Sequence, residues 1–362
     1  MKKTISLILI LAIWGGLAAF AWVKAPAEVS DAERRPLEQF PAVSGESLLS
    51  GQFMKDFADY AVDQFPLRDG FRSLNAYLTY YLLGQKDNNG IYLSDGYAAK
   101  MDYPLDEGSV SNALTRFMEL HELYLEGSEV HFALVPDKSY YLAEEAGVLA
   151  IDYDALYAHV AESLPWAELI DLRGFLDIED YYRTDTHWRQ EKLLPVAQKL
   201  AAAMGVTAPK AEDFTEVKVE RPFYGVYYGQ AALPMEAEEM YYLRSDLLDE
   251  SQVYLFETDS YSQVYDLTKL KSKDLYDIFL SGPRSLLTIE NPNAKTDREL
   301  IIVRDSFGSS IAPLLVQDYA KVTLVDIRYL NLNVLDRYLE FKGQDVLFLY
   351  SSLVLNNSET IQ

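Results

Sequence analysis

The segment Glu299–Gly308 constrains the fold of this 362-residue chain more than any other stretch. Its first five residues, ELIIV, are mostly apolar and branched, which is the composition of a buried parallel strand. A polar pair ends that run, and the helical spacing of SSIAPLLV begins at Ser309. We therefore predict that Ser306 lies in a tight strand-to-helix turn, at the carboxyl end of the strand and beside the N-terminal amides of a helix.

Two roles fit a serine in such a turn. Its side chain can cap the helix, which is the more common role of serine at this position. Its hydroxyl can instead act as a nucleophile, because helix N-terminal amides are able to hold an oxyanion. The segment by itself favours the cap, and a histidine held by a carboxylate elsewhere in the chain would reverse that preference.

The chain contains four histidines, so the search for such a partner is short. His187 stands in the motif YYRTDTHW and precedes an amphipathic pattern that predicts a helix over residues 187–204. The other three fall in helical or strand patterns and are most simply surface or packed side chains: His121, His131 and His159.

Asp185 and His187 are two residues apart, so in an extended or loop segment their side chains emerge on the same side. One carboxylate oxygen can then accept the imidazole Nδ1 proton, which leaves Nε2 free to accept a proton from Ser306. The alternative is a helix cap, for which Thr186 also qualifies, beside an incidental histidine. A turn serine in a chain with so few histidines favours the triad, which requires about 2.6–3.2 Å between Nε2 and the serine hydroxyl.

Helical and strand patterns alternate along the C-terminal part of the chain. Alternation of this kind predicts an α/β fold, with a parallel sheet covered by helices on both faces, over residues 108–362. An insertion of mixed strand character, residues 214–290, interrupts it. Besides the segments described above, we predict helices over 110–125 and 153–164 and strands over 129–135, 168–172, 321–327 and 345–350.

The amino terminus predicts a membrane segment over residues 1–24. Two lysines precede Ile5–Val23, which carries no charge and is long enough to cross a hydrocarbon core of about 30 Å. The small residues Ala25–Ala27 would also suit a signal-peptide cleavage site. We favour an uncleaved anchor, and in either case residues beyond about 30 face outward, because the positive end stays inside.

Between this segment and the sheet, we predict a stalk over residues 25–47 and a helical preface with a hairpin over residues 48–107. Arginine–proline and other breaker residues give the stalk little periodicity. The preface carries apolar residues at helical spacing and then a two-residue turn, Asp95–Gly96, typical of a hairpin.

Composition excludes several classes of function. A formal charge of −24, from 56 acidic and 32 basic side chains, disfavours nucleic acid and anionic membrane surfaces as partners. The absence of cysteine excludes disulfides, thiolate nucleophiles and lipid attachment through cysteine. The pair Asp152 and Asp154 opens a predicted helix, where the dipole favours aspartate, so we expect no metal and no cofactor.

The motifs TDTHW at 184–188 and VRDSFG at 303–308 together resemble the SGNH-hydrolase-like proteins of the alginate O-acetyltransferase family, and most of all the bacterial DHHW-motif proteins. The resemblance extends over roughly residues 30–355 and includes VPDK at 135–138 and VDIRY at 325–329. One departure is the threonine at position 186, where the DHHW motif has its first histidine. The resemblance implies an SGNH-hydrolase-like sheet, with Ser306 as nucleophile, His187 as base and Asp185 as its orienter.

The resemblance also implies a function. It suggests an extracytoplasmic, membrane-anchored O-acyltransferase, most simply an acetyltransferase, acting on a cell-surface or secreted polysaccharide. A partner, such as a multi-span membrane acyltransferase, would supply the acyl group, because acetyl-CoA is not available outside the cell. Two alternatives stay open: a carbohydrate esterase on the same triad, and a non-catalytic polysaccharide-binding or assembly protein.

The groups that would bind the oxyanion or the substrate are less defined by the sequence. We expect Arg304 to pair with Asp305, although it could also steady an acyl oxygen. Lys138 could contact substrate or cap a strand end. The segment 223–228 is predicted to form a hairpin that could line a sugar groove. Tyr224 is a candidate from that segment, and Gly308 is one from the serine turn. Four candidates rest on residue type alone: Gly282, Asn291, Gly225 and Asn293.

Overall fold

The computed structural model describes residues 2–361, which form two compact units. The N-terminal unit comprises the described chain up to Asn89 together with Tyr228–Met235. The sheet unit comprises Gly90–Tyr227 and the described residues from Glu236 onward. Each unit is treated separately below.

Within the described residues, the sheet unit is built on an eight-stranded sheet of order β10-β9-β11-β13-β12-β14-β5-β6. The strands β13, β12, β14, β5 and β6 run parallel to one another. On the other side of β13, the strands β11, β9 and β10 add antiparallel pairs. The bounds are β5 (Val130–Val135), β6 (Ala167–Asp171), β9 (Gln252–Leu255), β10 (Ser260–Gln263), β11 (Leu286–Glu290), β12 (Glu299–Arg304), β13 (Lys321–Val325) and β14 (Asp345–Ser351).

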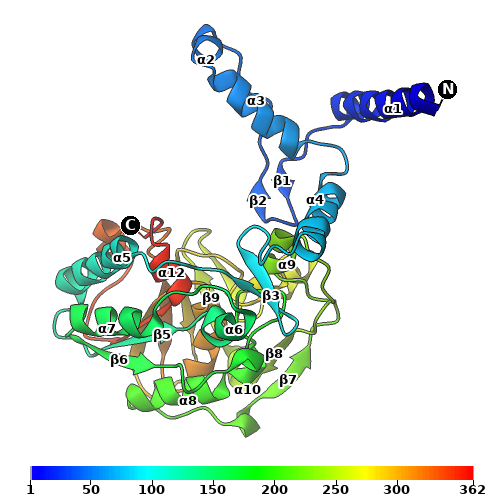
Figure 1. The fold of residues 1–362 in the computed structure, drawn as a ribbon. Helices are drawn as coiled ribbons and strands as arrows, with labels where there is room; N and C mark the ends of the chain where they lie inside the picture. Colours follow the sequence, from blue (N-terminus) through cyan, green and yellow to red (C-terminus); the bar gives the residue numbers. More distant parts are fainter. Residues whose placement is uncertain (1, 362) are drawn as a thin grey trace. The chain divides into compact units, whose positions relative to one another are not determined.

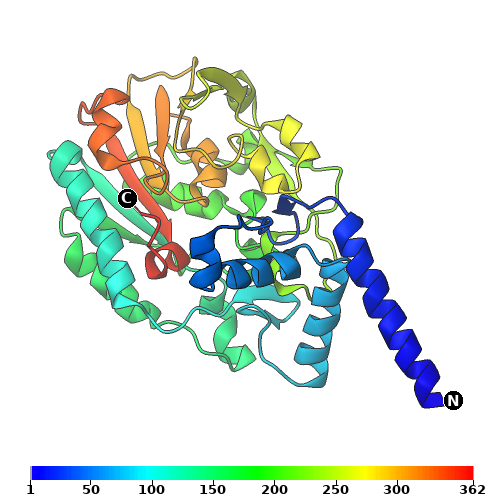
Figure 2. The same ribbon diagram turned by 90° about the horizontal axis from the view of Figure 1, so that it is seen from above.

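Helices cover both faces of this sheet, as Figures 1 and 2 show, so the predicted fold class is confirmed. The strand β12 lies between β13 and β14, with its carboxyl end directed at the start of α11. The helices of the unit are α5 (Glu107–Leu120), α6 (Ser139–Ala146), α7 (Tyr153–Ser163), α8 (Leu194–Ala203), α10 (Asp246–Glu250), α11 (Gly308–Ile311) and α12 (Ser352–Asn356).

Alternate residues of each central strand supply two separate cores. On β12, Leu300 and Ile302 pack in the cluster that includes α8 and α11, whereas Ile301 and Val303 pack in the cluster that includes α5 and α7. This follows from the two-residue period of a strand, which sends successive side chains to opposite faces. Because both faces are buried, the strand is apolar throughout, as the sequence indicates.

Two local predictions differ from the structure. The helix expected to begin at His187 begins at Leu194, because a bridge between Tyr181 and Trp188 and side-chain bonds to the backbone hold the preceding segment in a loop. Residues 223–228 do not form the expected hairpin: Phe223 makes an isolated bridge with Glu238, and a short helix, α9 (Val226–Ala231), begins within the segment. The predicted Asp95–Gly96 hairpin is confirmed as β3 (Ile91–Ser94) and β4 (Tyr97–Lys100), and β7 (Thr215–Lys218) pairs with β8 (Tyr241–Arg244).

The N-terminal unit begins with an exposed apolar helix. Its residues Thr4–Val23 are long and apolar enough to cross a membrane, which is compatible with a single-pass anchor or a signal sequence. A short hairpin and further helices follow. The bounds are α1 (Lys2–Val23), β1 (Val29–Ser30), β2 (Arg35–Pro36), α2 (Gly45–Leu49), α3 (Gln52–Asp63), α4 (Arg68–Tyr77) and a π-helical turn over Leu78–Leu82.

Candidate active site

Ser306 follows the last residue of β12 and precedes α11, in the strand-to-helix turn that the sequence predicts. The helix cap does not depend on it: the N-cap position belongs to Phe307, whose amide donates to Asp305 Oδ1 at 2.9 Å. The other oxygen of Asp305 accepts from the Ser351 amide at 2.8 Å, which ties the turn to β14. The Ser306 hydroxyl instead lies against a histidine.

Gly308 gives this turn its tight shape. A Cβ at this position would lie 2.7 Å from Arg304 Cβ, so a larger residue would push the helix away from the strand end. Its amide donates to the Asp305 carbonyl at 3.2 Å. Gly308 therefore shapes the turn, and its amide hydrogen bond is made within the turn itself.

The imidazole of His187 lies between Ser306 and Asp185. Its Nε2 is 2.8 Å from Ser306 Oγ, within the distance that the triad hypothesis requires, and its Nδ1 is 2.6 Å from Asp185 Oδ1. Because a carboxylate only accepts, Nδ1 carries the proton, and Nε2 accepts from the serine hydroxyl. The Asp185 side chain is fully buried and His187 is nearly so.

Backbone amides fix the Asp185 carboxylate in place. Oδ1 accepts from the His187 amide at 3.0 Å, and Oδ2 accepts from the Val226 amide at 2.8 Å. Gly225 makes the second bond geometrically possible, because any Cβ there would overlap the Asp185 backbone and Cβ. Gly225, a candidate by residue type, therefore lies behind the aspartate.

The loop that carries Asp185 and His187 is anchored on both sides. Trp188 Nε1 donates to Ser310 Oγ on α11 at 2.8 Å, which joins the histidine loop to the serine helix. On the other side, Lys138 Nζ donates to the carbonyls of Tyr182 and Arg183 at 2.9 and 3.3 Å. Lys138 is almost fully buried, and this desolvation lowers its pKa to about 7.

Glu238 is a residue of this site that the sequence did not indicate. Its carboxylate accepts from the Arg183 and Thr184 amides, both at 2.8 Å, and from the Thr184 hydroxyl at 2.5 Å. Thr184 in turn accepts from the Gly225 amide at 2.8 Å. Glu238 lies in the predicted insertion, far along the chain, so no local pattern could connect it with Thr184.

Tyr276 is a second residue that the sequence did not indicate. Its ring stacks on the His187 imidazole with centroids 3.9 Å apart and an angle of 8° between the planes. The phenol donates to Ser310 Oγ at 2.8 Å, and burial raises the pKa of Tyr276 above its ordinary value. The stacked ring fixes the plane of the imidazole.

A pocket of about 140 Å³ opens beside Ser306. Of the candidates for binding the oxyanion or the substrate, Arg304 and Gly282 line this pocket. Its wall combines aromatic, acidic and basic residues: Tyr276, Phe279, Tyr329, Asp274, Asp277, Asp326 and Arg328, with His187, Pro283 and Ser309 completing it. The pocket places the serine hydroxyl at the edge of a space suited to a small group.

The ion pair of Arg304 differs from the one expected. Its Nη1 lies 3.7 Å from Asp326 Oδ2, while its contact with Asp305 is a bond of 3.3 Å to the main-chain carbonyl. Arg328 also binds Asp326, through two bonds of 2.9 and 2.6 Å. The strand ends of β12 and β13 bring these residues together, whereas Asp305 turns inward to hold the serine turn.

The structure places the other candidates away from the pocket. Asn291 follows β11, which runs antiparallel to β13. It therefore lies at the amino ends of the parallel strands, whereas Ser306 lies at their carboxyl ends. There its amide group donates to the carbonyls of Val316 and Tyr319, and Asn293 donates to the Asn291 side chain at 3.0 Å. Tyr224 is exposed, on the segment before α9.

Comparison with known proteins supports this fold. Residues 165–325 match the DHHW protein family. The predicted resemblance to DHHW-motif proteins is thereby confirmed. The matched span contains both the Asp185–His187 loop and the serine turn. No curated protein matches the sequence.

Two solved structures with a TM-score of 0.59 share this fold at low sequence identity, and a third is more distantly similar. A DHHW family protein from Eubacterium siraeum is 20% identical, with a TM-score of 0.59 over 76% of this chain and 95% of its own. Bacillus cereus PatB1 with a sulfonyl adduct is 19% identical, with a TM-score of 0.59 over 73% and 95%. The O-acetyltransferase domain of Pseudomonas putida AlgJ is 13% identical, with a TM-score of 0.45 over 74% and 92%.

Proposed function

We propose that this chain is a serine-dependent O-acyltransferase, which transfers an acetyl group to a hydroxyl of a cell-surface or secreted polysaccharide. The observation that carries the proposal is the continuous set of bonds from Asp185 through His187 to Ser306, at 2.6 and 2.8 Å, at the mouth of a small pocket. A serine hydroxyl is a poor nucleophile unless a base accepts its proton, and this geometry provides that base.

In the first half-reaction, Ser306 Oγ bonds to the carbonyl carbon of the acyl donor while its proton moves to His187 Nε2. The tetrahedral intermediate then breaks its bond to the leaving group, which takes the proton from the imidazolium. Asp185 stabilises the positive charge on His187 throughout. The product of this half-reaction is an acyl-serine.

In the second half-reaction, a sugar hydroxyl gives its proton to His187 and its oxygen attacks the acyl-serine. The intermediate collapses, the C–O bond to Ser306 breaks, and the serine recovers its proton. Arg304 and Arg328 both line the pocket and both pair with Asp326, so the guanidinium groups that we propose to face each oxyanion are shared with that carboxylate. The limited volume of the pocket favours a short acyl group such as acetyl.

The N-terminal helix supports the proposed compartment, and the proposed donor is chosen to match that compartment. An apolar helix of 20 residues, Thr4–Val23, suits an anchor with the sheet unit outside. An acyl donor would then come from a membrane partner, for which a multi-span acyltransferase is the simplest source. The PatB1 structure holds a sulfonyl adduct; sulfonyl electrophiles bond to activated hydroxyls, and we expect one to label Ser306.

The test uses the full chain in detergent with an activated acetyl ester, with and without an acceptor oligosaccharide. We expect mass spectrometry to find an acetyl group on the peptide that contains Ser306, and acetylated sugar when acceptor is present. Ser306→Ala should lose both, while Ser309→Ala, on the neighbouring serine of the pocket wall, should keep the adduct.

Two outcomes would redirect the assignment. Release of acetate without any acetylated sugar would support a carbohydrate esterase on the same residues. Absence of an adduct and of turnover in a folded wild-type chain, with retained binding to glycan, would favour a non-catalytic polysaccharide-binding or assembly protein.

A further inference from the structure

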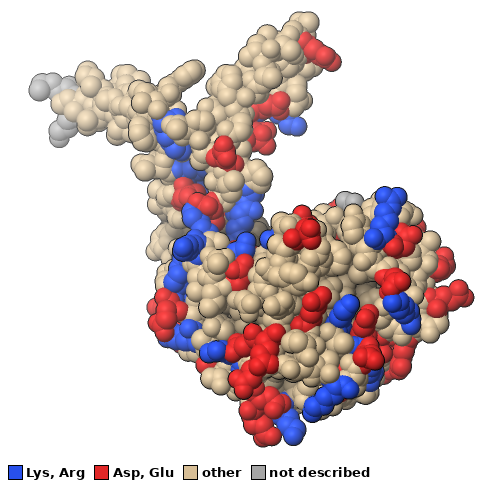
Figure 3. All heavy atoms as spheres, turned by 180° about the vertical axis from the view of Figure 1, so that it is seen from behind, with Lys and Arg blue, Asp and Glu red and all other residues tan. Residues whose placement is uncertain are grey.

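Exposed large apolar side chains are concentrated in the N-terminal unit. Beyond α1, they recur throughout residues 40–83, whereas the sheet unit exposes them singly. Figure 3 shows charged side chains on both units, with wide uncharged stretches along the helices of the N-terminal unit. The most exposed are Leu49 at 92%, Leu82 at 73% and Leu83 at 72%. Concentrated apolar exposure of this kind marks an interaction surface.

The surface belongs to two amphipathic elements. On α3, Phe53, Phe57 and Tyr60 form an aromatic cluster with Phe40, while Met54 and Val62 are exposed. The helix α4 and the π-helical turn after it expose Phe71, Leu74, Tyr77, Leu78 and Leu82. Leucine, phenylalanine and tyrosine are the residues that enter the boundary between lipid headgroups and acyl chains.

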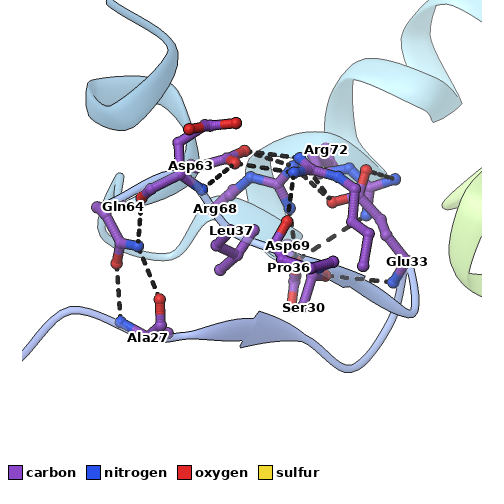
Figure 4. Close-up of polar contacts among 12 residues, drawn as sticks. Ala27, Ser30, Glu33, Pro36, Leu37, Asp63, Gln64, Arg68, Asp69 and Arg72 are labelled. Carbon is purple, nitrogen blue, oxygen red and sulfur yellow. Dashed lines mark hydrogen bonds and ion pairs between the residues drawn. The ribbon is translucent and has the colours of Figure 1, made fainter. Parts of the chain in front are cut away.

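The chain itself holds this surface close to the end of α1. The Ala27 amide donates to Gln64 Oε1 at 2.9 Å, and Gln64 Nε2 donates back to the Ala27 carbonyl at 2.8 Å, as Figure 4 shows. Gln64 directly follows α3, and Ala27 is four positions along the chain from Val23. Four residue steps span at most about 14 Å, and the two hydrogen bonds hold Gln64 against Ala27, so the end of α3 is kept close to the end of α1.

Ion pairs make the hairpin, α3 and α4 one rigid piece. Arg35 donates to both oxygens of Asp63, at 2.8 and 2.6 Å. Arg68 pairs with Glu33 at 2.5 Å and with Asp63 at 3.3 Å, and Arg72 pairs with Glu33 at 3.2 Å. These bonds engage the cations of α4 and leave the apolar residues of the same helix facing outward.

The charge of this segment indicates which lipid surface it suits. Residues 37–83 carry six acidic side chains (Glu38, Glu46, Asp56, Asp59, Asp63 and Asp69) and three basic ones (Lys55, Arg68 and Arg72). Attraction to anionic lipids needs a basic excess, which this segment lacks. Apolar contact with zwitterionic lipid is therefore the mode that the surface supports.

We propose that the N-terminal unit lies on the bilayer that α1 spans, with the exposed apolar residues of α3 and of the turn after α4 inserted between the lipid headgroups. The occupant of the surface is lipid with zwitterionic headgroups, bound by apolar burial. The proposal is independent of the acyltransfer chemistry, because it involves residues outside the triad and its pocket.

The absence of cysteine allows a direct test with single-cysteine variants of the full chain in phosphatidylcholine vesicles. An environment-sensitive fluorophore is attached at Met54→Cys or Leu82→Cys, and at Asp59→Cys, an exposed polar position of α3, as the matched control. We expect blue-shifted emission at Met54 and Leu82, strong quenching by spin-labelled lipid, and little dependence on salt. Asp59 should show water-like emission and quenching by an aqueous agent.

Three results would overturn the proposal. Equal water-like emission at all three positions would mean that the surface is not in lipid. Blue-shifted emission that resists the lipid quencher would assign the surface to a protein, either a second copy, if it depends on protein concentration, or a copurified partner, if it does not. Blue-shifted emission that becomes water-like at high salt would mean that charge, and not apolar burial, holds the surface on the bilayer.

Discussion

Asp63 in the N-terminal unit and Asp185 in the sheet unit are both buried aspartates, yet their partners differ in kind. Asp63 accepts two hydrogen bonds from the Arg35 guanidinium and one from the Glu38 amide at 2.9 Å. Asp185 bonds to the imidazole of His187 and to the amides of residues 187 and 226. One carboxylate therefore faces a permanent cation, and the other faces a ring that gains charge only when it accepts a proton.

This difference separates a structural role from a catalytic one. The hydrogen bonds from Arg35 lower the pKa of Asp63 to about 2, so its charge is constant at neutral pH and serves the fold. In the proposed mechanism, Asp185 stabilises the positive charge that His187 gains when it accepts the Ser306 proton. Substitution of the two aspartates should therefore affect different measurements.

The largest effect is expected from Asp185→Asn. The amide keeps an acceptor for the backbone but favours the wrong tautomer of His187, so we expect kcat for acetyl transfer to fall by roughly 10³- to 10⁴-fold. Steady-state kinetics with an acetyl ester would measure it, alongside thermal unfolding to show that the fold persists. A kcat within tenfold of wild type would remove Asp185 from the proposed mechanism.

Asp63→Asn should affect stability and leave the chemistry unchanged. It leaves the cations of Arg35 and Arg68 without their carboxylate, and we expect a loss of about 2 kcal/mol, below the range of fully buried pairs because Arg35 is partly exposed. Denaturant unfolding would measure it, with Asp69→Asn, whose carboxylate is 69% exposed, as the control. An unchanged free energy of unfolding would show that this ion-pair network makes no net contribution to stability.

The ion pair of Asp63 with Arg35 also predicts how stability depends on pH. A depressed carboxyl pKa contributes stability above its unfolded value of about 3.9, and that stability is lost as the pH falls toward the folded value of about 2. The difference in free energy of unfolding between wild type and Asp63→Asn should therefore be constant above pH 5 and shrink below pH 4. A difference that persists at pH 2 would argue that the carboxylate charge is not its source.

The parts of the site that could be predicted share a local signal. The turn around Ser306 follows from an apolar strand that meets a helical pattern, and Asp185 and His187 are neighbours in sequence. The proposed triad needs these residue types, and the two-residue spacing of Asp185 and His187 allows their side chains to meet. The central parallel strands could be predicted for a similar reason, since strands buried on both faces are apolar throughout.

The residues that could not be predicted lie far along the chain from the groups that they position. Glu238 and Val226 bind the Asp185 loop from 41 to 54 residues away, and Tyr276 stacks on His187 from the insertion. No periodicity marks such contacts. The late start of α8 has a related cause, because side chains of the loop bond to its own backbone and displace helical hydrogen bonds.

Lys138 allows a smaller test of how the Asp185 loop is held. Lys138→Met removes the donor to the Tyr182 and Arg183 carbonyls, and the loop should lose register with Ser306. We expect kcat to fall by about 10- to 100-fold with little change in KM. Lys342→Met, at a lysine that is 65% exposed, should have no effect on activity.

Lys138 predicts a rise of stability with pH in a different window from that of Asp63, because burial disfavours its charged form in the folded state. Burial lowers its pKa to about 7, so between pH 7 and an unfolded value of about 10.4 the unfolded chain binds the extra proton. The free energy of unfolding of wild type should rise over this interval relative to Lys138→Met. A flat difference would indicate that the buried amine keeps its charge.

The smallest expected effect concerns the ring beside the imidazole. Tyr276→Leu removes the aromatic face stacked on His187, and a face that attracts a cation contributes about 0.5–1 kcal/mol to the imidazolium that forms during reaction. We therefore expect a two- to fivefold lower kcat. Tyr276→Phe keeps the face and loses the bond to Ser310, so it should reduce stability by about 1 kcal/mol and leave kcat nearly unchanged. Parallel measurements of kcat and unfolding in both variants separate these roles, and equal losses of kcat would show that the phenol, and not the ring, matters.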